Sequence, residues 1–157
     1  CRSPMAAGVF GALAQRADLR EAFEIASAAT YDGHAGNPPG LLAKEAASRR
    51  GYDISAIRAR GLLAEDIAHF DNVIAMDRSN LTAIRWLAPS GLAERAQMLL
   101  KFAQPASSGD VADPYGGTRD DYERALNLIE VACAGLLQNL QMSHGLVGST
   151  KPHLSLA

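Results

Sequence analysis

The first residues of the chain carry groups suited to binding an anion. Ser3 is a type favoured at the N-cap of a helix, and Pro4 suits the first helical position because its missing N–H needs no partner there. A helix that begins here presents free backbone N–H groups and a partial positive charge. Arg2 adds a guanidinium that can hold a phosphate through two hydrogen bonds. Taken alone, these residues also fit a plain helix cap beside a surface arginine.

Composition limits the class of protein. The 157 residues suffice for one domain with a sizeable core, and 48% hydrophobic with 20% charged residues is typical of a globular protein. The net charge of -2 argues against a nucleic-acid partner or a polybasic membrane contact. Two cysteines, Cys1 and Cys133, cannot form a disulfide framework or a zinc site by themselves. We expect no metal, no cofactor, no nucleic-acid or membrane partner, and a reducing, cytoplasmic setting.

Apolar alternation and helical spacing predict strands that alternate with helices. Predicted strands cover 23–27, 73–76 and 98–100, and predicted helices follow Ser3, cover 41–50 and 64–70, and start again at a Ser79 cap. Thr118 and Asp121 form a capping box for a last helix with an apolar period from Tyr122 to Leu140. This order predicts the α/β class, with an open parallel sheet and helices on both faces.

The carboxyl edge of such a sheet is where ligands bind. Three loops meet there: the one before Ser3, the one after Ser27, and the long loop at 101–117 that holds Asp113. Long loops in compact domains tend to be functional. Asp113-Pro114 alone fits a plain turn better than a catalytic role.

Four segments in sequence order resemble the low-molecular-weight protein tyrosine phosphatases. They are 1–6, similar to the end of that family's phosphate-binding loop, 27–39, 74–81, and 111–117, similar to its general-acid loop. The segment 129–137 also resembles its last helix, so the similarity reaches to about Gln141. One such motif is weak evidence, whereas four in order are specific. The resemblance implies a flavodoxin-like fold with a four-stranded parallel sheet.

The resemblance also implies a mechanism, in which a cysteine thiolate attacks phosphotyrosine and a phosphocysteine is then hydrolysed. Arg2 is then the phosphate arginine, and Asp113 the general acid and base, so both should line one cleft. Substrate or phosphate contacts fall on Cys1, Arg2, Ser3, Tyr31 and Tyr115, with Ser27 and His34 in support. A helix N-terminus and an arginine favour a thiolate and stabilise a transferring phosphoryl group. The implied partner is a phosphotyrosine protein or a small aryl phosphate, and nothing indicates an oligomeric state.

One departure from the family is serious. There the nucleophile lies five residues before the cysteine that precedes the arginine, and Cys1 matches this later cysteine. We therefore expect the nucleophile and the first, central strand upstream of residue 1. Cys133 cannot replace the nucleophile, because it sits on the apolar face of a predicted helix. Residues 1–142 would be a phosphatase domain that lacks its central strand, and 143–157 a flexible tail. Such a chain should be inactive, and marginally stable because two strand edges lack a partner.

Smaller departures affect the walls of the predicted site. Gly33 stands where the family often has an aromatic residue, for which Tyr31 could partly compensate. Gly116 replaces a second aromatic that some members carry, and Ile57 stands where some have a histidine.

Two alternatives stay open. An arsenate reductase of the same fold tends to carry Gln where this chain has Pro4, and it needs further redox cysteines, for which only Cys133 is available. A non-catalytic anion-binding or interaction protein would keep the fold and bind phosphate without hydrolysis.

Overall fold

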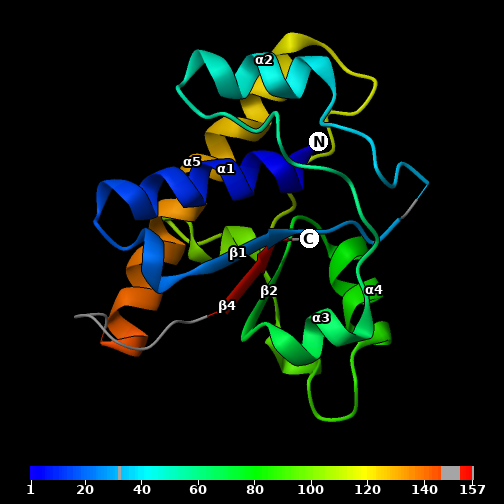
Figure 1. Cartoon of the computed structure of the whole chain (residues 1–157), viewed down its shortest axis with the longest axis vertical. Helices are drawn as coiled ribbons and strands as arrows, with labels where there is room; N and C mark the ends of the chain where they lie inside the picture. The colour runs from blue at the N-terminus through cyan, green and yellow to red at the C-terminus, as the bar shows by residue number, and fades with distance from the viewer. Residues whose placement is uncertain (32, 146–152, 157) are drawn as a thin grey trace.

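The computed structural model describes residues 1–31, 33–145 and 153–156 (Figure 1). The helices are α1 (Arg2–Arg16), α2 (Leu41–Arg49), α3 (Ala64–His69), α4 (Arg78–Leu87) and α5 (Arg119–His144). The strands are β1 (Glu24–Ser27), β2 (Asn72–Ala75), β3 (Ala96–Met98) and β4 (His153–Leu156). Short 3-10 helices cover Arg20–Ala22, Ala93–Arg95 and Leu99–Phe102.

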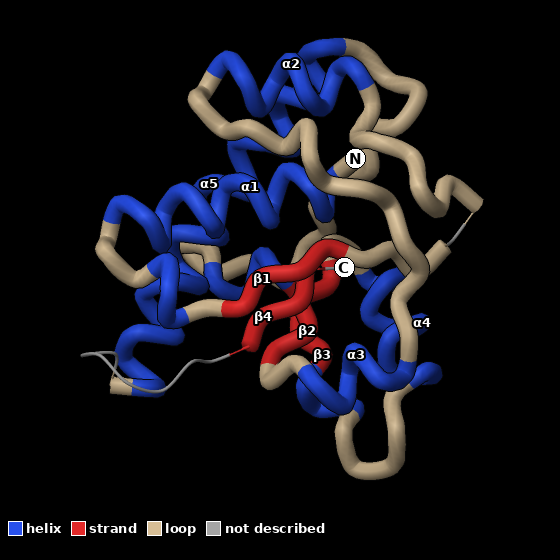
Figure 2. The backbone as a smooth tube through the Cα atoms, in the orientation of Figure 1, coloured by secondary structure: helices blue, strands red, loops and turns tan. Residues whose placement is uncertain are grey.

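The strands form one parallel sheet in the order β1-β4-β2-β3, with helices on either side (Figure 2). Side chains of β2 alternate between two cores, because successive residues of a strand point to opposite faces. Ile74 belongs to the core under α1, α2 and α5, whereas Val73 and Ala75 belong to the core with α3 and α4. The predicted α/β class, with a four-stranded parallel sheet covered on both faces, is confirmed.

The occupant of the sheet centre differs from the expectation. The sequence predicted a vacant centre and a flexible tail at 143–157, yet α5 continues to His144 and residues 153–156 form β4 between β1 and β2. Residues 146–152 and 157 lie outside the described residues. A vacant centre would leave two rows of backbone groups without partners, and the Leu156 side chain, which is fully buried, fills the core there. The expected unpaired edges of β1 and β2 are both paired with β4.

Two predicted helix starts are corrected by tertiary contacts. The cap of α4 is Asp77 and not Ser79, since the Asp77 carboxylate accepts the Asn80 backbone N–H at 2.7 Å. Helix α1 begins at Arg2, with Cys1 in the N-cap position, so Ser3 lies inside the first turn and its hydroxyl bonds elsewhere. The capping box of Thr118 at the start of α5 is confirmed.

The third strand also begins earlier than predicted. The apolar run at 98–100 read as a strand, whereas β3 covers Ala96–Met98 and the next residues form the 3-10 helix Leu99–Phe102. Leu99 and Leu100 are buried, so their apolar character serves the core under α5 and not the sheet.

Candidate active site

Arg2 is fixed at the carboxyl edge of the sheet by acceptors from distant segments. Its Nη1 donates to Asp77 Oδ2 at 2.7 Å and to the Val111 carbonyl oxygen at 2.5 Å. Its Nη2 lies 3.8 Å from Asp113 Oδ2. The Arg2 side chain is 11% exposed, so water screens these contacts little. The guanidinium is thus held in one orientation before any ligand arrives.

Asp77 is the main partner of Arg2 and was not among the predicted site residues. It lies two residues after the end of β2 and caps α4, which places its carboxylate beside the first turn of α1. Partial burial opposes ionisation, but the Asn80 N–H and the Arg2 guanidinium outweigh it and hold the pKa of Asp77 below its ordinary value. An acidic residue directly after a buried strand, at the edge where Arg2 was expected, was the available signal for it.

The Ser3 and Ser27 hydroxyls meet next to Arg2. Ser3 Oγ lies 2.9 Å from Ser27 Oγ and donates to the Leu156 carbonyl oxygen at 2.5 Å. Because the only Ser3 hydroxyl proton goes to Leu156, Ser27 is the donor between the two serines. The structure therefore joins α1, β1 and β4 at one point.

Asp113 enters from the long loop before α5. The loop is anchored to the end of β2, because the Val111 N–H donates to the Met76 carbonyl oxygen at 2.8 Å. Asp113 Oδ1 accepts the Tyr115 N–H at 3.1 Å, a local turn that orients the carboxylate. Its side chain is 55% exposed, so it can exchange protons with water or a bound molecule.

One open pocket of about 370 Å³ connects these residues. The segments 1–3 and 28–31, together with His34, Asp113 and Tyr115, supply most of its wall. Seven of the eight predicted site residues line it, namely Cys1, Arg2, Ser3, Tyr31, His34, Asp113 and Tyr115. The eighth, Ser27, contacts the pocket residue Ser3. Arg2 and Asp113 share this cleft, as expected.

Aromatic residues form the rim of the pocket. The His34 ring lies 6.0 Å from the Tyr31 ring and 5.8 Å from the Tyr115 ring, measured between centroids. The Tyr31 ring occupies the space above Gly33, because a Cβ on that glycine would lie 2.2 Å from the Tyr31 hydroxyl oxygen. Tyr31 thus fills the position where a side chain on residue 33 would lie. Ile57, another of the departures, packs against the core.

The two cysteines have different surroundings. Cys1 Sγ lies 3.4 Å from the Tyr122 hydroxyl oxygen, beside the pocket. Cys133 is fully buried in α5 with its Sγ 3.8 Å from the Ala6 carbonyl oxygen, and burial raises its pKa far above the ordinary range. The Cys133 thiol is therefore a core group and not a nucleophile.

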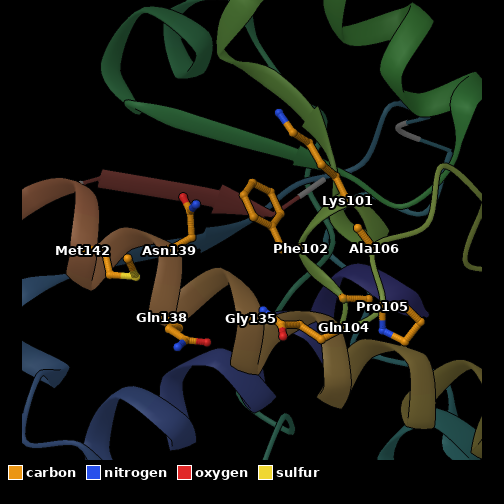
Figure 3. A pocket seen from close by; sticks show the side chains of 10 residues that line it. Lys101, Phe102, Gln104, Pro105, Ala106, Gly135, Gln138, Asn139 and Met142 are labelled. Carbon is orange, nitrogen blue, oxygen red and sulfur yellow. The ribbon is translucent and has the colours of Figure 1, made fainter.

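A second pocket lies away from this site, between the 101–106 segment and the C-terminal half of α5 (Figure 3). Its volume is about 340 Å³, and Gln104, Gln138 and Asn139 give it an amide-rich wall. Gly135 lets α5 approach the Phe102 carbonyl, from which an added Cβ would be only 1.8 Å away. None of the predicted site residues lies in this pocket.

Other kinds of site find no support within the described part of the chain. No group of three or more His, Cys, Asp or Glu side chains there could hold a metal ion. No helix described by the structure is long and apolar enough to cross a bilayer.

The fold and site together define an α/β protein with an arginine-based anion pocket at the carboxyl edge of a parallel sheet. The sequence pattern of the low molecular weight phosphotyrosine protein phosphatases matches residues 1–145. The chain belongs to this family.

Named relatives agree with this assignment. The chain is 33% identical over 141 residues to the low molecular weight protein-tyrosine-phosphatase YfkJ of Bacillus subtilis, covering 90% of this chain and 89% of the relative. It is 32% identical to the human low molecular weight phosphotyrosine protein phosphatase, covering 88% and 87%.

Solved structures are also similar. The crystal structure of YfkJ superposes with a TM-score of 0.85 at 32% identity, covering 91% of this chain and 89% of that one. A protein tyrosine phosphatase from Entamoeba histolytica, crystallised with Hepes in the active site, superposes with a TM-score of 0.85 at 27% identity, covering 92% and 91%.

Proposed function

We propose that the protein is a protein-tyrosine phosphatase whose substrates are phosphotyrosine proteins or small aryl phosphates. The observation that supports this most is the shared pocket of Arg2 and Asp113, in which a partly buried, fixed cation faces an exposed carboxylate. Family membership and the names of the relatives support the same reaction. No cofactor is required for it.

Arg2 binds the phosphate in this proposal. Its Nη1 is already committed to Asp77 and Val111, which leaves the Nε and Nη2 edge to grip two phosphate oxygens. Arg2 and Ser3 of the first turn of α1 line the pocket, and the free N–H groups of that turn add a partial positive charge. Together these groups stabilise the charge on the transferring phosphoryl group.

The nucleophile is the cysteine that the resemblance implies five residues before Cys1. Its thiolate attacks phosphorus, an S–P bond forms, and the P–O bond to the phenol breaks while Asp113 donates its proton to the leaving oxygen. Asp113 then takes a proton from water, which attacks phosphorus, and the S–P bond breaks to restore the thiolate. Residues 1–157 alone should show no turnover, because Cys133 is buried and Cys1 stands at the position of the later cysteine.

The aromatic rim gives the proposed preference for a phenyl ring. Tyr31 and Tyr115 are 70% and 69% exposed, so their side chains are available to contact a bound ring. His34 lies between them and sets their spacing. The Tyr31 ring occupies the part of the pocket wall that a larger residue at position 33 would form.

The test is turnover of p-nitrophenyl phosphate by a protein that carries the upstream loop with its cysteine. Arg2→Ala and Asp113→Asn should each lower kcat/KM by at least about a hundredfold. The matched controls are Arg58→Ala, an exposed arginine that bonds only its own segment, and Asp120→Asn in the first turn of α5. A protein with the upstream cysteine that hydrolyses no aryl phosphate would refute the proposal.

The alternatives make different predictions in the same assays. An arsenate reductase requires a redox partner for its thiol, and Cys133 is buried against the Ala6 carbonyl. A non-catalytic anion-binding protein predicts phosphate binding without turnover even when the upstream loop is present.

A further inference from the structure

The edge of the sheet formed by β3 is open and borders a groove. Strand β3 stands last in the sheet and pairs with β2 alone among the described strands (Figure 2). A strand with one neighbour leaves the backbone N–H and C=O groups of its other side without a strand partner. All three residues of β3 line a groove of about 450 Å³, so this free edge is accessible from the groove.

The walls of this edge groove come from two distant segments. Helix α4 supplies Leu81 and Arg85 on one side, and residues 106–108 supply the other. The second wall is fixed, because the Ser107 N–H donates to the Leu100 carbonyl oxygen at 2.9 Å. Part of the lining is apolar and can exclude water from a contact, namely Leu81, Ala96, Met98 and Ala106. The edge groove is therefore a formed surface and not only a strand with a missing neighbour.

The two ends of the edge groove carry opposite charges. Glu94 lies two residues before β3 and Lys101 lies three residues after it, and both line the groove. Glu94 is exposed and forms no ion pair with a described residue. Lys101 Nζ donates to Gln97 Oε1 at 3.0 Å, which holds the ammonium along the strand. The third charged group, Arg85, belongs to the α4 wall and not to the strand edge.

This order of charges makes the edge complementary to itself. Two copies related by a two-fold axis near Gln97 have antiparallel β3 strands, so each Glu94 lies at the end where the other copy has Lys101. Opposite charges then meet at both ends of the contact. A parallel copy would instead bring Glu94 to Glu94 and Lys101 to Lys101, which is unfavourable. The charges therefore favour one occupant, a second copy of this chain in the antiparallel direction.

We propose that the edge groove is the interface of a homodimer, in which two β3 strands pair antiparallel and continue the sheet across a two-fold axis. Main-chain hydrogen bonds join the two edges, the apolar lining excludes water, and the end charges fix the direction. The proposal does not rest on the proposed function, because no residue of the edge groove lines the pocket of Arg2.

The first test is sedimentation equilibrium of the 157-residue chain over a concentration series at low salt. We expect a monomer–dimer equilibrium that weakens as salt is added. Glu94→Lys and Lys101→Glu should each raise the dimer dissociation constant at least about tenfold, because each puts like charges at both ends. The matched control is Glu21→Lys, the same change of charge on an exposed residue outside the groove, which should leave the constant unchanged.

Exchanging the two charges separates direct pairing from general damage. Glu94→Lys combined with Lys101→Glu should restore the dissociation constant of the unmodified chain, because opposite charges again meet at both ends. An equimolar mixture of the two single variants should form heterodimers for the same reason. A chain that stays monomeric throughout the series would overturn the proposal. A dimer that neither single variant weakens, or that the double variant does not restore, would overturn it as well.

Hydrogen exchange identifies the edge that pairs. The amides of β3 at 96–98 should exchange more slowly at protein concentrations above the dissociation constant than below it. Those of β1 at 24–27, the opposite edge of the sheet, should exchange at the same rate in both. Protection that appears at β1 and not at β3 would show that a dimer uses the wrong edge for this proposal.

Discussion

The floor and the rim of the pocket are built in different ways. At the floor, Arg2 and Asp77 have side chains that are 11% and 19% exposed and form a 2.7 Å ion pair. At the rim, Asp113 is 55% exposed, and Tyr31 is 70% exposed. The buried pair provides a cation that needs no rearrangement before it binds, while the exposed groups remain free to meet a substrate and to exchange protons. Changes at the floor should therefore affect stability as well as function, and changes at the rim should affect function alone.

Asp113→Asn gives the largest expected effect on function. In the protein with its upstream cysteine, loss of the proton donor should lower turnover by about 10²–10⁴-fold. The free energy of unfolding should change by less than about 0.5 kcal/mol, because the carboxylate is more than half exposed and comes no closer than 3.8 Å to Arg2. Turnover and urea unfolding on the same preparation check both parts. A large loss of stability would show that Asp113 belongs to the floor.

Asp77→Ala should give the largest effect on stability. It leaves the partly buried Arg2 without its close partner and removes the cap of α4, so we expect a loss of about 3 kcal/mol. Urea unfolding measures it. Asp110→Ala is the matched control, since Asp110 pairs with the exposed Arg78 at the same helix start and should cost less than about 1 kcal/mol. Equal losses would contradict a special role of the buried pair.

The same pair predicts how stability depends on pH. The pKa of Asp77 is lowered by folding from its ordinary value of 3.8, so the folded state favours the ionised carboxylate. Its contribution is complete above pH 3.8 and is lost as the pH falls below it through the folded-state pKa. The difference in melting temperature between the unmodified chain and Asp77→Asn should therefore shrink as the pH is lowered from about 5 to 2. A difference that stays constant over this range would show that Asp77 does not titrate in this way.

Tyr31→Ala should affect the recognition of the ring and not of the phosphate. Affinity for phenyl phosphate should fall about fivefold, about 1 kcal/mol for one lost aromatic contact, while affinity for inorganic phosphate stays the same. Titration of both ligands on the 157-residue chain measures this. Trp86→Ala, an 87% exposed aromatic on α4 and not among the residues that line the pocket, is the control. Equal losses for both ligands would place Tyr31 at the floor.

The sequence predicted those features that depend on local pattern. Val73 and Ile74 read as a buried strand because both faces of β2 are covered, and Thr118 marked the start of α5 through its capping box. The residues of the pocket were found because their order matched a family, and not because their chemistry was visible in isolation. Features decided by distant partners were missed.

Asp77 and β4 are the two clearest cases of this limit. Asp77, and not the predicted Ser79, caps α4, and it also pairs with Arg2, a contact between residues far apart in sequence. Strand β4 belongs to a segment that was read as a tail with little to bury, and it joins the sheet because β1 and β2 both offer backbone groups to it.

Replacing Ser155 should give the smallest change in stability. It tests whether the polar groups of β4 are as well paired as those at the pocket floor. Its side chain is fully buried, and its hydroxyl has no hydrogen-bond partner among the described residues. An unpaired buried hydroxyl costs free energy that alanine does not, so Ser155→Ala should raise the free energy of unfolding by about 1 kcal/mol. Urea unfolding measures the change, and Ser143→Ala is the control, an exposed serine on α5 whose hydroxyl donates to the Asn139 carbonyl of its own helix. The floor satisfies its buried polar groups through Arg2 and Asp77, whereas β4 carries one that is not satisfied. A loss of stability on Ser155→Ala would show that the hydroxyl has a partner and that the central strand is as closely matched to its neighbours as the ion pair is.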